Sequence, residues 1–260
     1  MCSSDLPALI LVFTYSLLTI PAAIIGIPWT LITGDISRLY GWAMWILRLG
    51  TRAAGIRVDV QWRAPLDPAT RYIFLSNHIS NLDPPILLPV LPGRVSVFIK
   101  RSLTKLPILG YGMKLGDFIP VDRDGRVESA KESVKVAARV LASGVHVMSF
   151  VEGTRSRDGR LLPFKKGPFY LAMETGAPVV PVSIWGTETM MKKGSVKIYP
   201  GVAHVTFHAP LHPADFATRE ELMDSVRRAM ESSLPEWMGL AVKANAPSAP
   251  EDTDPSLRSK

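Results

Sequence analysis

Cysteine is nearly absent from this chain: its 260 residues contain one, Cys2. A single cysteine can form neither an intrachain disulfide nor a zinc site built from several thiolates, so the fold must rest on its core. The chain also lacks any G-x-S-x-G sequence, which argues against a serine hydrolase with the usual nucleophile elbow. No internal repeat is present, and the length suits one large domain or two small ones.

Charge is scarce as well, because charged residues make up 20% of the chain and apolar residues 47%. The mean hydropathy of +0.16 is high for a freely soluble protein. The net charge is nevertheless +7, which favours anionic partners such as anionic lipid, nucleic acid or a phosphorylated substrate. Basic residues interleaved with exposed aromatic residues are missing, so we expect no nucleic-acid partner.

No charged residue occurs between Asp5 and Asp35. A helix needs about 20 apolar residues to cross a bilayer; this run is long enough, but Pro21 and Pro28 would kink or break it. Residues 6–33 are therefore expected to form one kinked spanning helix or a shallow re-entrant hairpin, with a buried core helix as the weaker alternative. A secretory signal peptide is not expected, because a basic start and a small-x-small cleavage site are both missing.

The following stretch combines apolar residues with aromatic and arginine side chains, at Arg38, Tyr40, Trp42, Trp45, Arg48 and Arg52. This mixture is typical of a helix at a membrane interface. We therefore expect residues 1–55 to form a membrane-anchoring helical pair. Because the arginines follow the apolar run, the rest of the chain should face the cytoplasm.

From residue 56 the pattern changes to short β-rich runs that alternate with helical patterns. Strands are predicted at 56–62, 71–77, 94–100, 145–153 and 178–186, and a hairpin at 195–211 that turns at Pro200-Gly201. Helices are predicted at 84–91, 127–144, 167–177 and 218–234. Such alternation indicates an α/β domain over residues 56–240, with a single mixed, largely parallel sheet flanked by helices. Residues 241–260 are polar and Pro-rich, and are expected to be a disordered tail.

The stretch LSNHISNLDPP, residues 75–85, follows a predicted buried strand and contains His78 and Asp83. Five residues along a helix rotate by about 140°, so these side chains can meet only if the segment between them turns. A carboxylate on Nδ1 of the imidazole would fix its tautomer and leave Nε2 free as a base. The alternative is structural, with Asp83 as a helix cap before Pro84 and His78 as a loop residue.

Cations follow three other apolar runs. Residues 150–169 include Arg155, Arg157, Arg160, Lys165 and Lys166, and further cations occur at Lys100, Arg101 and Arg123. Arginine in a Gly-containing loop suits phosphate binding, because its planar fork matches phosphate oxygens. Ordinary surface charge is the alternative; it fits Arg157 and Arg160 better than Arg123 and Arg155, which lie just beyond apolar strands.

Four blocks in this order make the chain resemble the glycerolipid acyltransferases, specifically the bacterial 1-acyl-glycerol-3-phosphate (lysophosphatidic acid) acyltransferases. The first block, N-H-x4-D, matches Asn77, His78 and Asp83. The second matches Lys100, Pro107, Gly110, Gly116 and Arg123, and the third, F-x-E-G-T-R-S with F-K-x-G, matches Phe150, Glu152, Gly153, Thr154, Arg155, Ser156, Phe164, Lys165 and Gly167. The fourth is the V-P-V run at 180–182. The resemblance covers about residues 56 to 210, and Pro120 departs from the apolar residue that is common inside the second block.

The resemblance implies that His78 is the general base and that Asp83 orients it. The free sn-2 hydroxyl of lysophosphatidic acid would attack the thioester of acyl-CoA or acyl-carrier protein, giving phosphatidic acid for phospholipid synthesis. The acceptor phosphate would be bound by Arg123, Glu152, Gly153, Thr154 and Arg155, assisted by Lys100 and Lys165. No metal and no cofactor is expected besides the acyl donor as co-substrate.

Other functions remain open from the sequence. Within the family, the acceptor could be another lysolipid, such as lyso-ornithine lipid, or glycerol-3-phosphate. Outside it, the chain could be a membrane-anchored thioester hydrolase or a non-catalytic binder of anionic lipid. The expected partners are a membrane lipid acceptor, the acyl donor and an anionic membrane surface, and the expected location is the bacterial inner membrane.

Overall fold

The fold, obtained as a computed structural model, describes residues 5–122, 127–192 and 194–239. Its helices are α1 (Asp5–Thr33), α2 (Ser37–Ala53), α3 (Asp83–Leu87), α4 (Leu109–Leu115), α5 (Val127–Ala142), α6 (Gly167–Thr175), α7 (Thr187–Met190) and α8 (Arg219–Glu231). Its 3₁₀ helices are η1 (Leu88–Val90), η2 (Arg101–Lys105), η3 (Pro213–Asp215) and η4 (Glu236–Met238). Its strands are β1 (Ile56–Trp62), β2 (Ile73–Ser76), β3 (Val95–Lys100), β4 (Ile119–Val121), β5 (His146–Phe150), β6 (Val179–Trp185) and β7 (Gly201–Phe207).

The strands form one sheet in the order β1-β7-β6-β2-β5-β3-β4. The pairs are parallel except β6 with β7, which is antiparallel. The predicted fold class, a single mixed and largely parallel sheet flanked by helices, is confirmed. Pro120 lies in β4 at the edge of the sheet, where a residue without an N–H costs the ladder least.

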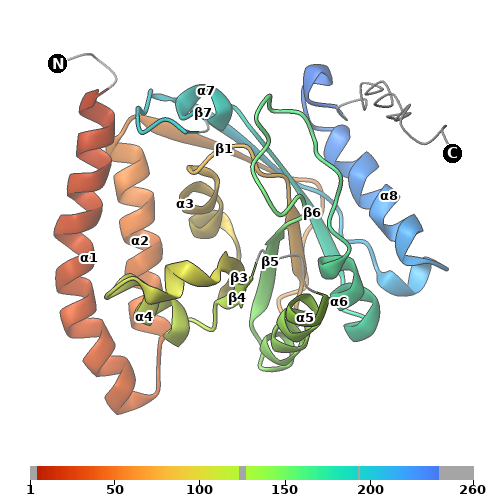
Figure 1. The fold of residues 1–260 in the computed structure, drawn as a ribbon, viewed down its shortest axis with the longest axis horizontal. Coiled ribbons are helices and arrows are strands. Elements are labelled where there is room, and N and C mark those ends of the chain that lie inside the picture. Colours follow the sequence, from red (N-terminus) through yellow and green to blue (C-terminus); the bar gives the residue numbers. More distant parts are fainter. Residues whose placement is uncertain (1–4, 123–126, 193, 240–260) are drawn as a thin grey trace, which may run out of the picture.

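Both faces of the sheet are buried (Figure 1). Along β2, Phe74 belongs to one hydrophobic cluster with residues of α3, whereas Ile73 and Leu75 belong to a second cluster with residues of α5, α6 and α8. Successive side chains of a strand point to opposite faces. The central strands β2, β5 and β6 are therefore buried along nearly their whole length, as expected for a parallel sheet covered by helices on both sides.

The two N-terminal helices pack against each other on one side of the sheet (Figure 1). Two glycines permit close contact, since a Cβ at Gly50 would lie 2.1 Å from the ring of Tyr15 and one at Gly26 would lie 2.7 Å from Leu39. The predicted helical pair is thus present, and α1 continues through both Pro21 and Pro28. Helix α1 is not a core helix, because its outer face is exposed. Only 11% of its most apolar stretch of 18 residues is buried.

The predicted hairpin at 195–211 is wrong. Residues 195–200 form no strand, and β7 begins only at Gly201. Val196 is 81% exposed and Ile198 3% exposed, whereas residues two apart share one face of a strand, so this segment lacks the burial pattern of a strand. In addition, β7 is already paired with β1 on one side and β6 on the other, so no free edge is left for residues 195–200.

Helix boundaries follow the expected signals. Thr218 accepts a hydrogen bond from the backbone N–H of Glu221 at 3.2 Å and caps α8, and Gly144, with φ +89°, follows the end of α5. The predicted tail at 241–260 lies outside the described residues, as does Arg123.

Candidate active site

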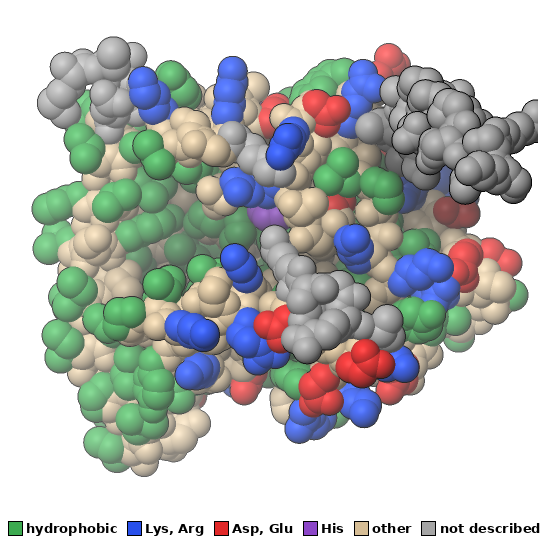
Figure 2. Space-filling model, in the orientation of Figure 1, with side chains coloured by type: hydrophobic (Ala, Val, Ile, Leu, Met, Phe, Trp, Pro, Cys, Tyr) green, Lys and Arg blue, Asp and Glu red, His purple; other side chains and the backbone are tan. Residues whose placement is uncertain are grey.

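The candidate site lies where the parallel strands end. His78 comes two residues after β2, Glu152 two residues after β5, and Lys100 is the last residue of β3. The carboxyl ends of parallel strands share one edge of the sheet, which is where ligands bind in open α/β folds. Figure 2 shows Lys and Arg side chains gathered around the middle of one face of the molecule.

The predicted contact between imidazole and carboxylate is present. His78 Nδ1 and Asp83 Oδ2 lie 2.8 Å apart, with Asp83 fully buried and the His78 side chain 13% exposed. The His78 ring also stacks on Phe150, with the ring centroids 4.0 Å apart. An imidazole whose Nδ1 faces a carboxylate holds its proton there, so Nε2 is left as the basic nitrogen.

Asp83 holds the turn as well as the ring. Its Oδ2 accepts hydrogen bonds from the backbone N–H groups of Ile79 and Ser80, both at 2.8 Å, and its Oδ1 accepts one from the Thr187 hydroxyl at 2.6 Å. Asp83 is the first residue of α3, and its side chain folds back over the preceding turn. The structural alternative raised by the sequence, a helix cap at Asp83, is not realised, because the N-cap position of α3 is Leu82 and no side chain caps it. The carboxylate instead organises the preceding turn and orients the imidazole.

Asn77 fixes the residue before the histidine. Its side-chain amide donates to the carbonyl of Ile184 and accepts from the N–H of Ile184, both at 2.8 Å. The side chain thus pairs with β6 as a backbone peptide would. It is fully buried, which anchors the start of the His78 turn to the sheet.

Glu152 lies beneath the histidine rather than in the open site. Its side chain is 1% exposed, and Oε1 accepts a hydrogen bond from the backbone N–H of His78 at 3.2 Å. Burial raises the pKa of Glu152 to about 8, although backbone N–H groups of His78 and Leu162 act in the opposite direction. At neutral pH this carboxyl is therefore mostly protonated.

Replacing Glu152 with glutamine should remove a pH dependence of stability. The pKa of this carboxyl rises from 4.5 to about 8 on folding, so unfolding releases a proton and the free energy of unfolding falls as the pH rises towards 8. Burial lowers the pKa values of His146 and His208 to about 4. These two histidines make the free energy of unfolding rise with pH, but only at pH values below the ordinary histidine pKa of 6.5. Between about pH 7 and 8 the wild type should lose about 1 kcal/mol that Glu152→Gln keeps.

Chemical denaturation at a series of pH values measures this difference. Glu174→Gln, at a residue exposed near the end of α6, is the matched control and should keep the wild-type slope. Equal slopes for wild type and Glu152→Gln would show that the buried carboxyl is ionised in the folded state.

The loop after Glu152 is tied to the His78 turn. Ser156 donates its backbone N–H to the His78 carbonyl at 2.9 Å. Gly153 has φ +68° and lies against the stem of Lys165, where a Cβ would come within 3.2 Å. This loop brings Thr154, which is exposed, and Arg155, which is half-buried, to the same edge of the sheet.

Two of the remaining predicted cations, Lys100 and Lys165, are exposed around this edge. Arg123 lies outside the described residues. The structure therefore brings together His78, Asp83 and the 152–155 loop. The assignment of individual residues to a phosphate stays a prediction.

One residue that the sequence reasoning missed is Thr187. It is fully buried in α7, immediately beyond β6, and bonds Asp83 from 104 positions away. Its position after the strand containing the V-P-V run is the only signal in the sequence. Thr187 completes a chain of hydrogen bonds from the hydroxyl through the carboxylate to the imidazole.

Replacing Thr187 with valine should lower kcat about tenfold and leave KM for the acceptor unchanged. The substitution keeps the shape but removes the hydroxyl, and a hydrogen bond to a charged group contributes about 1.5–3 kcal/mol. Asp83 then loses the contact that fixes Oδ1, and with it the orientation of His78. Steady-state kinetics of Thr187→Val and Thr187→Ser measure this: serine should restore kcat, whereas equal losses in both would rule out the hydroxyl.

Other polar groups are placed elsewhere. Ser183 Oγ lies 2.9 Å from His208 Nε2, but both residues are buried and Ser183 also donates to the Met230 carbonyl, so this pair serves packing. Among the described residues, no group of three or more His, Cys, Asp or Glu is arranged to hold a metal ion.

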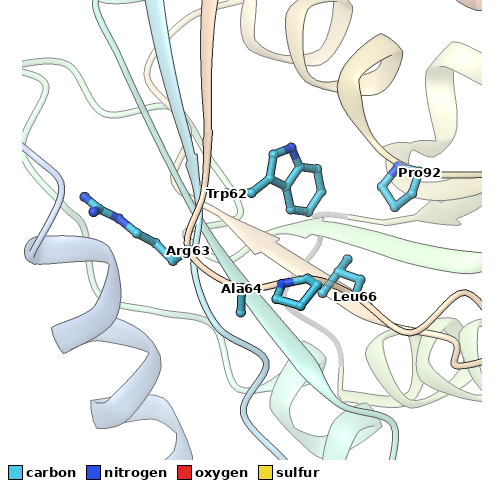
Figure 3. A pocket seen from close by; sticks show the side chains of 6 residues that line it. Trp62, Arg63, Ala64, Leu66 and Pro92 are labelled. Carbon is cyan, nitrogen blue, oxygen red and sulfur yellow. The ribbon is translucent and has the colours of Figure 1, made fainter.

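A hollow of about 390 Å³ follows the end of β1, lined by Trp62, Arg63, Ala64, Pro65, Leu66 and Pro92. In Figure 3, Trp62 and Arg63 point to opposite sides of the strand, and Trp62 points towards Pro92. The side chains around this hollow are mostly apolar and include none of the predicted site residues.

Comparisons with known proteins identify the family of this chain. The family model described as Acyltransferase matches residues 57–185. The 1-acyl-sn-glycerol-3-phosphate acyltransferase of Limnanthes douglasii is 33% identical over 208 residues, covering 77% of this chain and 70% of that protein. This chain belongs to the 1-acyl-sn-glycerol-3-phosphate acyltransferase family. The resemblance predicted from the four sequence blocks is thus confirmed, and the protein is an acyltransferase.

Two further relatives extend the comparison. The human 1-acyl-sn-glycerol-3-phosphate acyltransferase alpha is 33% identical over 179 residues, which cover 68% of this acyltransferase and 63% of the human protein. The crystal structure of the 1-acyl-sn-glycerophosphate acyltransferase from Thermotoga maritima superposes with a TM-score of 0.76 at 26% identity, covering 88% of this chain and 93% of that one. Helix α1 is long and apolar enough to cross a membrane, which together with family membership indicates membrane association.

Proposed function

We propose that this acyltransferase transfers an acyl group from acyl-CoA or acyl-carrier protein to the sn-2 hydroxyl of lysophosphatidic acid, producing phosphatidic acid. The observation that carries the proposal is the 2.8 Å contact between His78 Nδ1 and buried Asp83, in a chain related to acyltransferases named for this acceptor. The same chemistry would serve phospholipid synthesis.

In the proposed mechanism, Nε2 of His78 takes the proton of the acceptor hydroxyl. The hydroxyl oxygen then attacks the thioester carbonyl carbon, a C–O bond forms, and the C–S bond breaks. The proton leaves with the thiol, so no acyl-enzyme is needed. Asp83 stabilises the imidazolium that forms between these steps.

For the oxyanion, the N–H groups of Ile79 and Ser80 do not serve in this conformation, because both donate to Asp83. For the phosphate, we propose that the cations Arg123, Arg155, Lys100 and Lys165 supply the charge, with Gly153 and Thr154 shaping the loop. Glu152 would not contact the phosphate but would hold the backbone of His78 through its hydrogen bond to the His78 N–H.

Replacing Arg155 with alanine should raise KM for the acceptor about 10- to 100-fold with a smaller change in kcat. A charge-assisted hydrogen bond to phosphate contributes about 1.5–3 kcal/mol, and Arg155 lies on the loop tied to His78. Arg157→Ala is the matched control, since Arg157 is exposed in the same loop. Unchanged KM in Arg155→Ala, or equal changes in both variants, would remove Arg155 from the phosphate site.

The membrane-facing part of the proposal concerns residues 1–55. We propose that α1 and α2 anchor the enzyme at the bacterial inner membrane with residues 56–240 in the cytoplasm, α1 either spanning the bilayer or entering one leaflet. A lipid acceptor then reaches the site without lifting its chain into water, which would cost about 0.8 kcal/mol per CH₂.

Acyl transfer by the purified full chain tests the function. Lysophosphatidic acid, lyso-ornithine lipid and glycerol-3-phosphate are compared as acceptors, each with acyl-CoA and with acyl-carrier protein. The proposal expects the highest kcat/KM with lysophosphatidic acid. Preference for another acceptor would reassign the substrate, and thioester cleavage that is independent of acceptor would indicate a hydrolase.

A further inference from the structure

The segment that follows β3 exposes an unusual run of large apolar side chains. Residues 103–111 present Leu103, Leu106, Ile108, Leu109 and Tyr111, each between 37% and 48% exposed. Single exposed apolar residues are common on soluble proteins, but a contiguous group marks a surface that binds another apolar phase. We define these five residues as the apolar ridge.

The backbone holds the ridge in place. Ile108 has φ 61° and ψ −67°, and the N–H of Leu109 donates to the Pro107 carbonyl at 2.6 Å, which makes a strained γ-turn. Gly110 lies directly on the preceding turn, since a Cβ there would be 2.5 Å from the Thr104 carbonyl oxygen. A β-branched residue in this region of φ persists only where its surroundings impose it, so these side chains project outwards from a fixed scaffold.

The ridge lies on the same side of the sheet as α1 and α2. Met113 of α4 packs on the same hydrophobic cluster as Tyr15 of α1 and Met44 and Leu47 of α2. Figure 1 shows α4 on that side. The outer face of α1 is itself apolar and exposed, so the ridge shares its side of the molecule with the apolar face of α1.

Exposed cations border the ridge: Lys100 precedes it, Lys105 lies within it, and Lys114 follows it. Apolar side chains inserted beside several lysines are the combination that binds anionic bilayers, each basic residue contributing about 1 kcal/mol near the surface. An acidic carrier protein would also be attracted by the lysines. The exposed apolar residues on both the ridge and α1 favour lipid, because a protein partner would not cover α1.

We propose that the apolar ridge and its lysines form a second contact with an anionic lipid bilayer, separate from the α1–α2 pair. The inference rests on the proposed function, in which the acceptor is a membrane lipid. Lys100 ends β3 at the sheet edge that also carries His78. Docking of the ridge would therefore hold that edge at the level of the phosphate headgroups.

The test uses the full chain with its one cysteine, Cys2, replaced by serine. An environment-sensitive fluorophore is attached through Leu109→Cys, or through Lys131→Cys at an exposed position of α5 as the control. On phosphatidylcholine vesicles containing phosphatidylglycerol, the emission of the label at 109 should shift to the blue and be quenched by lipid-bound quenchers. The label at 131 should not respond.

Charge variants supply the second measurement. The pair Lys105→Glu and Lys114→Glu should weaken the response at 109 at least tenfold in lipid concentration, whereas the matched pair Lys131→Glu and Lys135→Glu should not. The proposal is overturned if the label at 109 stays in water while the protein sediments with vesicles. It is equally overturned if the label responds only to acyl-carrier protein, or to protein concentration without lipid.

The outcome is independent of catalysis. A label at 109 that remains in water in an enzyme that acylates lysophosphatidic acid removes the second contact and leaves the proposed function standing. A label that enters the bilayer in an enzyme inactive on every acceptor supports the contact while the proposed function fails.

Discussion

Replacing His78 with alanine should lower kcat for acyl transfer by at least about a thousandfold and leave the fold intact. Proton transfer by a positioned base contributes about 10²–10⁴ in rate. His78 is held by Asp83 at 2.8 Å and by stacking on Phe150. Its ring is partly exposed, so its removal opens the site to water without leaving an enclosed cavity, and the loss should appear in kcat more than in stability.

Kinetics of purified His78→Ala and thermal unfolding of the same sample measure the two effects separately. His212→Ala is the matched control, because this histidine is exposed in the segment before η3. An alanine variant with more than a tenth of wild-type kcat would show that His78 is not the base. An unfolded variant would instead be followed by His78→Gln, which keeps a polar side chain at the turn.

The second large effect is expected at Asp83, where asparagine should lower kcat about a thousandfold. The amide oxygen can take the place of Oδ2 and still accept from Ile79 and Ser80, while the amide nitrogen faces the Thr187 hydroxyl, which can accept a hydrogen bond. The turn is therefore kept, but the negative charge beside His78 is lost. A neutral partner stabilises the imidazolium far less than a carboxylate does.

Alanine at the same position separates the two roles of the carboxylate. Asp83→Ala leaves the buried N–H groups of Ile79 and Ser80 without their acceptor, at about 1–3 kcal/mol each. It should unfold at a lower temperature than Asp83→Asn. Asp59→Asn is the matched control, because exposed Asp59 pairs with half-buried His204 at 3.2 Å in a similar contact outside the site. Activity in Asp83→Asn close to that of Asp59→Asn would exclude the orienting carboxylate.

Predictions from the sequence succeeded where the determining contacts are local. The His78–Asp83 contact needs only a turn of five residues, and the intervening Ser80 and Asn81 favour such a turn. The end of α5 at Gly144 and the cap of α8 at Thr218 are likewise set within a few residues. The hairpin failed because β7 is already paired with β1 and β6, so residues 195–200 have no free neighbouring edge with which to form a strand.

The sequence by itself determined the alternation of strands and helices, the histidine with its carboxylate, the apolar N-terminus and the family. These depend on periodicity, on residue type and on spacings of a few positions. The tertiary structure decided that Thr187 bonds Asp83, that Glu152 is buried and largely protonated beneath His78, and that the apolar ridge shares a side with α1. Those properties arise from contacts between residues far apart in the chain and from the exclusion of water around them. The spacing of residues along one sequence reveals neither the contacts nor the burial.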